Sequence, residues 1–68
     1  MKLADMRRQV AMTQMDVAIE VGAKQSSVSY WEQGVYEPSL AQAKALAALY
    51  KVTTDDIIDA FREAKETA

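Results

Sequence analysis

Hydrophobic residues recur at helical spacing along most of this 68-residue chain, and small polar residues or glycine separate one run from the next. The runs predict five helices, over approximately residues 2–10, 14–21, 25–33, 40–50 and 54–65. Threonine or serine stands just before three of them, at Thr13, Ser39 and Thr53, where its side chain can cap a helix. No alternating pattern predicts a strand. The sequence therefore predicts an all-α fold in a single domain spanning residues 1–68.

Two of the predicted helices meet at a glycine. Val17 and Val21 lie on the inner side of the second helix, and Gly22 follows, where a left-handed residue ends a helix at little cost. In the third helix Val28 and Trp31 take the inward positions, so its polar start faces outward. Two short helices joined by a tight turn, with a polar outer side on the second, are typical of a helix-turn-helix that enters a DNA groove.

Composition excludes several other classes of protein. The chain contains no cysteine and no histidine, so it has no disulfide framework, no thiolate site and no usual general base. We interpret Asp55 and Asp56 as first-turn residues that favour the helix dipole rather than as a catalytic pair. The sequence has no apolar run of about 18 residues and no signal-peptide pattern. We expect a cytoplasmic protein that is not an enzyme and binds no metal, cofactor or membrane.

The charge of the chain argues against DNA binding, because DNA-binding domains are usually basic. The formal net charge is −2 and the pI is near 4.9. This charge is uneven: residues 1–51 carry six Lys/Arg against five Asp/Glu, a net of +1, whereas residues 52–68 carry two against five, a net of −3. Weak basicity lowers the expected non-specific affinity but leaves room for site-specific binding through a few contacts.

Several short motifs stand at characteristic separations between Leu3 and about Ile58. They are Arg7, Thr13-Gln14, Val17-Ala18, Val21-Gly22, Val28-Ser29-Tyr30-Trp31-Glu32-Gln33-Gly34 and Pro38-Ser39-Leu40. Together they resemble the Cro/repressor-type helix-turn-helix family, also called the XRE family. The resemblance implies a five-helix, lambda-repressor-like DNA-binding domain in which helices 2 and 3 form the helix-turn-helix. The chain departs from the family where glycine is usual, at Ala11 and Lys51, and where larger aliphatic residues are usual, at Ala43 and Tyr50.

The resemblance assigns to the major groove five residues on the third helix and just before it: Lys24, Gln25, Ser26, Ser29 and Tyr30. Helix geometry favours the same side, because Val28 and Trp31 point inward. Gln25 can pair with adenine through two hydrogen bonds, and Lys24 can donate to guanine or to a phosphate. The alternative for both is a solvated helix start. Tyr30 suits either a DNA contact or a partly buried packing role.

Other side chains are candidates for the sugar-phosphate backbone. Three serine hydroxyls can reach phosphate or base edges, those of Ser26, Ser27 and Ser29. Gln14 opens the second helix, where N–H groups and the helix dipole favour a phosphate, and the resemblance gives its side chain the same role; the alternative is a polar residue without a partner. Gln33 and the backbone of residues 34–36 are further candidates. Val35 and Glu37 stand where relatives carry basic residues, which should reduce the salt dependence of binding.

The resemblance also implies an ion pair between Arg7 in the first helix and Glu32 near the end of the third. We interpret it as structural, because it would orient the recognition helix. Such a pair adds little net stability, yet breaking it on one side is costly.

Apolar residues of the last two helices, including Leu40, are mostly expected in the core. The fifth helix nevertheless has more apolar surface than one small core readily covers. We expect one of Ile57, Ile58 and Phe61, with part of Tyr50, to form a dimer patch. The alternative is a monomer with a fully internal fifth helix.

These observations predict a sequence-specific double-stranded-DNA-binding transcriptional regulator of bacterial or phage origin, a repressor that binds a palindromic operator as a homodimer. The alternative is an antitoxin or adaptor that uses the same fold mainly to bind a partner protein. The acidic last segment and the apolar fifth helix favour that alternative.

Overall fold

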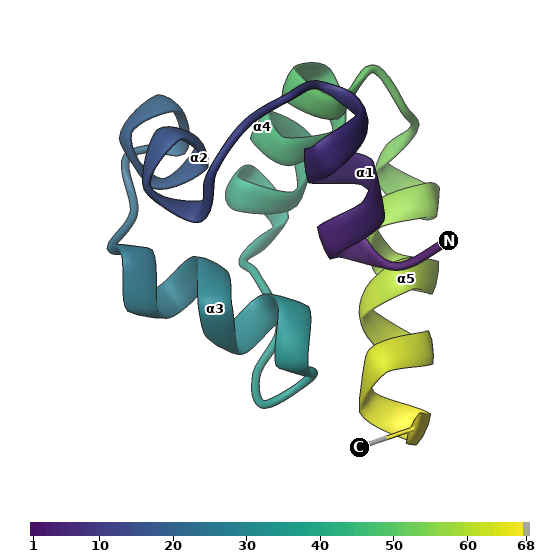
Figure 1. Ribbon diagram of the computed structural model, residues 1–68. Helices are drawn as coiled ribbons and strands as arrows, with labels where there is room; N and C mark the ends of the chain where they lie inside the picture. Colours follow the sequence, from purple (N-terminus) through teal and green to yellow (C-terminus); the bar gives the residue numbers. More distant parts are fainter. Residues whose placement is uncertain (68) are drawn as a thin grey trace.

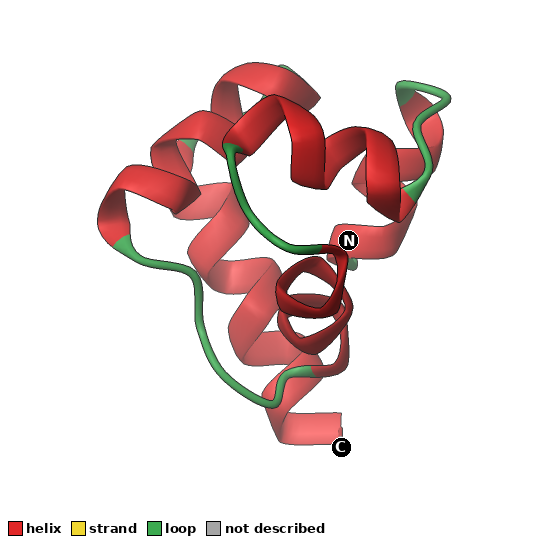
Figure 2. Cartoon of the chain, turned by 90° about the vertical axis from the view of Figure 1, so that its left-hand side faces the viewer, coloured by secondary structure: helices red, strands yellow, loops and turns green. Residues whose placement is uncertain are grey.

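The computed structural model describes residues 1–67. It contains five helices: α1 (Leu3–Gln9), α2 (Gln14–Val21), α3 (Gln25–Gln33), α4 (Leu40–Tyr50) and α5 (Thr54–Thr67) (Figure 1). These bounds lie within two residues of those predicted from the sequence. Figure 2 shows only helices and connecting loops over the described residues. The expected all-α fold with five helices is therefore confirmed.

Reciprocal hydrogen bonds fix the starts of three helices. At α2 the N–H of Asp16 donates to the Thr13 hydroxyl at 3.1 Å, and the N–H of Thr13 donates to the Asp16 carboxylate at 2.9 Å. The same arrangement precedes α4 and α5, where the partners are Ser39 with Gln42 and Thr53 with Asp56. Each capping box satisfies two N–H groups that the helix itself leaves free. Asp56 is thus a capping residue as well as an acidic residue of the first turn.

Two of these caps make stability depend on pH. Hydrogen bonds from Thr13, first from its backbone and then from its side chain, lower the pKa of Asp16, and Thr53 lowers the pKa of Asp56 in the same way. Because both pKa values are lower in the folded chain, the stabilisation is present above the ordinary carboxyl pKa and is lost as the pH falls below about 4.

We therefore expect the double substitution Asp16→Asn, Asp56→Asn to lower the melting temperature at pH 7 and to have a smaller effect at pH 3. Circular dichroism measures both melting temperatures. The control is Asp55→Asn, an exposed carboxylate in the same turn of α5 that is not part of a capping box. An equal loss at both pH values for the double variant would contradict this account.

All five helices contribute to one hydrophobic core. In Figure 1, α2 and α3 lie on the left and α5 on the right, with α1 and α4 between them. The largest fully buried side chains come from four helices: Trp31, Leu46, Ile57, Val17 and Val28. Two helix pairs that follow each other in sequence pack together, α2 with α3 and α4 with α5. Among residues 1–67, none of the helices combines the length and the apolar character needed to cross a membrane.

Burial narrows the choice of residues for the expected dimer patch, which stays a prediction. Tyr50 and Phe61 are each 5 % exposed and Ile57 is fully buried, so these three side chains belong to the core of the chain itself. They would have to leave that core to contact a second copy. Only Ile58 stays partly exposed. Leu40, expected in the core, is 64 % exposed, because the first residue of α4 lies at the edge of the packed helices.

Two non-glycine residues, Ala11 and Lys51, adopt the left-handed backbone conformation that favours glycine. Ala11 has φ 57° and Lys51 has φ 59°. Lys51 lies directly after α4, and its backbone N–H donates to the Ala47 carbonyl. Both residues hold this conformation at a cost in backbone energy that glycine would avoid.

Candidate nucleic-acid interface

The turn between α2 and α3 places the start of α3 at the surface. Gly22 ends α2 at φ 70° and ψ 36°, and the N–H of Ala23 donates to the Ala18 carbonyl at 2.9 Å. Lys24 then takes an extended backbone and α3 begins. Val28 and Trp31 are each 1 % exposed and face the core, as the sequence predicted.

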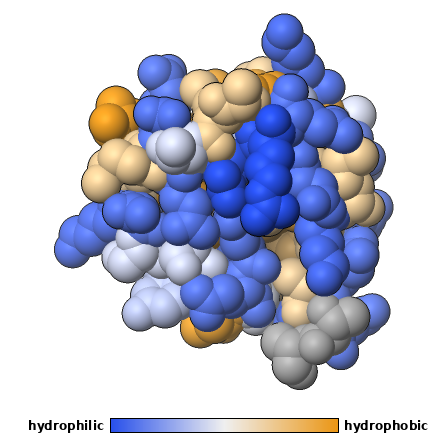
Figure 3. Space-filling model, viewed as in Figure 1, coloured by the Kyte–Doolittle hydropathy of each residue, from blue (hydrophilic) through white to orange (hydrophobic). Residues whose placement is uncertain are grey.

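Three polar residues at the beginning of α3 point away from the core. The side chains of Lys24, Gln25 and Ser26 are all exposed. Figure 3 shows a mostly blue to white, that is hydrophilic to neutral, surface over α3 at the lower left of the molecule. Serine side chains are short, so this surface can approach another molecule closely. The first residues assigned to base contacts, Lys24, Gln25 and Ser26, are therefore accessible to another molecule.

The remaining predicted contacts on α3 are partly engaged within the chain. Gln33 donates from Nε2 to the Ser29 hydroxyl at 2.7 Å, one helical turn away. Ser27 is half-buried and accepts a hydrogen bond from the Tyr36 hydroxyl at 3.1 Å. Tyr30 is 42 % exposed, so it is available at the surface. Serine hydroxyls and the Gln33 amide keep further hydrogen-bonding capacity for a ligand.

A polar cluster ties α1 and α2 to the end of α3. Arg7 donates from Nε to Glu32 Oε2 at 2.7 Å and from Nη2 to Glu32 Oε1 at 3.3 Å, and its Nη1 donates to the Met12 carbonyl at 2.9 Å. Gln14 adds a third hydrogen bond to Glu32, donating from Nε2 to Oε1 at 3.0 Å. The side chains of Arg7 and Glu32 are only 12 % and 9 % exposed. The cluster thus joins the last turn of α1, the start of α2 and the end of α3.

This cluster changes the interpretation of Gln14, which the sequence assigned to a phosphate. One N–H of its amide is used by Glu32, which leaves the other N–H and the carbonyl oxygen for further partners. A phosphate oxygen accepts hydrogen bonds only, so a contact with DNA would use the second N–H. The contact with Glu32 and a contact with a phosphate are therefore compatible at Gln14.

The surface around α3 carries little charge. Glu32 raises the pKa of Arg7, first through the hydrogen bond and then through charge, so the guanidinium stays protonated. Burial, together with the nearby Glu32 charge, raises the pKa of Tyr50, which stays neutral behind the cluster. Lys24 is an exposed cation on the interface, whereas Arg8 pairs with Asp5 at 3.5 Å on α1. Such a surface should bind nucleic acid with a weak dependence on salt.

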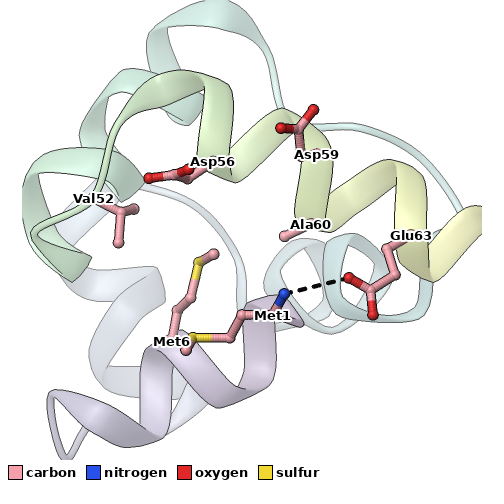
Figure 4. A pocket seen from close by; sticks show the side chains of 7 residues that line it. All are labelled: Met1, Met6, Val52, Asp56, Asp59, Ala60 and Glu63. Atoms are coloured by element: carbon pink, nitrogen blue, oxygen red, sulfur yellow. Dashed lines mark hydrogen bonds and ion pairs between the residues drawn. The ribbon is translucent and has the colours of Figure 1, made fainter.

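A hollow lies between the start of the chain, α1 and α5 (Figure 4). This hollow of about 350 Å³ is lined by Met1, Met6, Val52, Asp56, Asp59, Ala60 and Glu63. The amino group of Met1 lies 3.4 Å from Glu63 Oε2. The carboxylates that line this hollow would repel phosphate, so the hollow does not extend the nucleic-acid surface. Within residues 1–67, no group of three or more acidic side chains is placed to hold a metal ion.

Comparison with known proteins identifies the class of this fold. The sequence matches the family described as "Helix-turn-helix domain" over residues 1–61. The chain therefore belongs to the helix-turn-helix domain family, which confirms the resemblance found in the sequence. This class consists of DNA-binding regulatory domains and not of enzymes, in agreement with the expectation that the chain is not an enzyme.

Two relatives from Archaeoglobus fulgidus are each named "Uncharacterized HTH-type transcriptional regulator". One is 29 % identical over 56 residues, which cover 82 % of this chain and 80 % of the relative. The other is 30 % identical over 56 residues, which cover 82 % and 79 %. No solved structure matches the chain significantly. Both relatives are archaeal, so a bacterial or phage origin stays a prediction.

Sequence reasoning missed two features of this surface. The contact from Gln14 to Glu32 joins residues 18 positions apart, and that from Tyr36 to Ser27 joins residues 9 positions apart. For residues 34–36 the sequence predicts a contact through the backbone alone. The signal available for Tyr36 was an aromatic residue in a polar loop directly after the recognition helix, where an unsupported ring would be exposed.

Proposed function

We propose that the chain is a sequence-specific double-stranded-DNA-binding transcriptional regulator that docks α3 in the major groove. The observation that carries this proposal is that the polar start of α3 is exposed. Val28 and Trp31, on the opposite side of the same helix, are buried in the core and hold α3 in place. A helix that is packed on the core by one side and exposes hydrogen-bonding side chains on the other suits direct reading of base edges. Membership of the helix-turn-helix family and the names of the two relatives support it.

The residues divide into two kinds of contact. Gln25, Ser26 and Ser29 would read base edges, with Lys24 donating to guanine or to a phosphate. Gln14 and Gln33, together with Ser27, would contact the sugar-phosphate backbone and set the register of α3. Tyr30 lies between these groups. Binding alone regulates transcription by blocking or recruiting polymerase, and no chemical step is required.

The repressor role, the palindromic operator and the homodimer are finer parts of this proposal. A two-fold dimer would place two half-sites about 34 Å apart, one turn of the duplex. With Tyr50, Ile57 and Phe61 buried, the dimer surface would have to use Ile58 and other exposed residues. Equilibrium sedimentation at high micromolar concentration decides this point, because the mass of one chain excludes the dimer.

Substituting Gln25 should weaken binding at one base position. We expect Gln25→Ala to cost about 1–3 kcal/mol on a duplex enriched from randomised DNA and to relax the preference at the position that Gln25 reads. Lys24→Ala should instead reduce the salt slope by about 1 if Lys24 binds a phosphate. Gel shifts on the wild type and the variants measure both effects.

The matched control for Gln25→Ala is Gln9→Ala, a substitution of the same residue type at an exposed position on α1. It should leave the affinity and the base preference unchanged. Selection of no consensus, with equal binding by the wild type and both α3 variants, would contradict the proposed function and favour a protein-binding adaptor.

A further inference from the structure

The loop after α3 folds back along the outer side of that helix. Gly34 takes a left-handed conformation at φ 75°, and the N–H of Val35 donates to the Tyr30 carbonyl at 3.0 Å. Tyr36 then reaches the first turn of α3, where its hydroxyl donates to Ser27 at 3.1 Å. Its ring also lies against that of Tyr30, with centroids 5.4 Å apart and planes at 55°. We call Tyr30 and Tyr36 the tyrosine pair.

The tyrosine pair presents apolar surface beside polar reading residues. Tyr30 is 42 % exposed and Tyr36 is 44 % exposed, although each ring packs on the other. Tilted ring contacts of this kind and the bond to Ser27 hold both rings in place. The neighbouring side chains on this side of α3 are serines, too short to cover them. A fixed aromatic surface is therefore continuous with the surface proposed to bind DNA.

The major groove offers one apolar group to such a surface, the 5-methyl group of a pyrimidine. The other groups that distinguish the bases in that groove are hydrogen-bond donors and acceptors. Resting on the proposed function, we propose that the tyrosine pair reads the 5-methyl group of a thymine in each bound site. Tyr30 makes the contact from α3, and Tyr36 packs against it and closes the other side of the methyl group. Tyr36 thereby adds a specificity-determining side chain from outside the helix-turn-helix.

The test replaces thymine with deoxyuridine, one position at a time, in a duplex enriched from randomised DNA. Deoxyuridine keeps the base pair and removes only the methyl group. At one position in the site we expect the wild type to lose affinity about fourfold, the factor that burial of one methyl group gives. Tyr30→Ala and Tyr36→Ala should bind the thymine duplex more weakly and show no further loss on the deoxyuridine duplex.

Two controls separate a specific contact from a general change. Val35→Ala removes an exposed apolar side chain from the same loop and should keep the fourfold discrimination. Tyr36→Phe removes the hydrogen bond to Ser27 but keeps the ring, so this variant should keep most of the discrimination between thymine and deoxyuridine. The unfolding curve of each variant, followed by the fluorescence of buried Trp31, verifies that it is folded.

Equal affinity of the wild type for thymine and deoxyuridine at every position would overturn the inference. So would a loss that persists unchanged in both alanine variants. Tighter binding after methylation of a cytosine, without any loss on deoxyuridine, would assign the methyl group to 5-methylcytosine and overturn the thymine reading. Absence of any enriched sequence is a different outcome, because it contradicts the proposed function itself.

Discussion

Replacement of Gly34 by alanine is expected to lower the free energy of unfolding by about 3 kcal/mol, a large part of the stability of a domain of this size. A Cβ atom at this position would lie 2.6 Å from the backbone nitrogen of Lys65 and 2.7 Å from the carbonyl carbon of Ala64. Both are backbone atoms of α5, which cannot move aside as a flexible side chain can. The left-handed backbone of Gly34, with φ 75°, adds to the cost.

Gly22→Ala is the matched control, because it separates these two contributions. Gly22 has a similar φ of 70°, yet a Cβ atom there would meet nothing within 4 Å. We expect a loss of only about 1–2 kcal/mol from backbone strain. Urea unfolding followed by the fluorescence of Trp31, the single tryptophan, measures both variants. Equal losses would show that α5 does not press on the turn after α3.

Replacement of Glu32 by alanine should have the second large effect, a loss of about 3 kcal/mol. It removes the acceptor shared by Arg7 and Gln14. The partly buried guanidinium of Arg7 then keeps one of its three hydrogen bonds, the one to the Met12 carbonyl. Removing one partner of an ion pair that is shielded from most of the solvent is costly, because the other charge is left unpaired. For a chain of this length the melting temperature should fall by more than 10 °C, at about 4–8 °C per kcal/mol.

Two further variants give this prediction its controls. Glu20→Ala removes an exposed carboxylate from α2 and should change the melting temperature little. The double variant Arg7→Met, Glu32→Leu should recover part of the loss, because it leaves no unpaired charge. At temperatures where Glu32→Ala is still folded, it should prefer the same DNA sequence as the wild type. An unaltered melting temperature of Glu32→Ala would contradict the structural role of the pair.

Local signals in the sequence were enough to predict the helices. Thr13, Ser39 and Thr53 start helices through contacts three residues away, and such short-range contacts are visible in the sequence. Gly22 and Gly34 end helices for an equally local reason, their left-handed backbone. The assignment of Val28 and Trp31 to the core followed from helical spacing alone. It fixed the outward side of α3, on which the proposed function depends.

Tertiary packing decided what the sequence could not. Periodicity leaves open which of two adjacent isoleucines faces inward, and the fold buries Ile57 and leaves Ile58 partly exposed. Leu40 fits the apolar pattern of α4, yet the helix begins at the edge of the core. The contact of Gly34 with α5 depends on how α5 packs, far along the chain. No spacing rule reports such an approach.

The central claim is that the outer side of α3 reads DNA sequence. The most direct measurement is selection from randomised duplexes followed by sequencing, run in parallel on the wild type and on Gln25→Ala. We expect the wild type to enrich one motif and Gln25→Ala to enrich the same motif with one position no longer specified. Identical motifs for both proteins, or no motif for either, would contradict the claim.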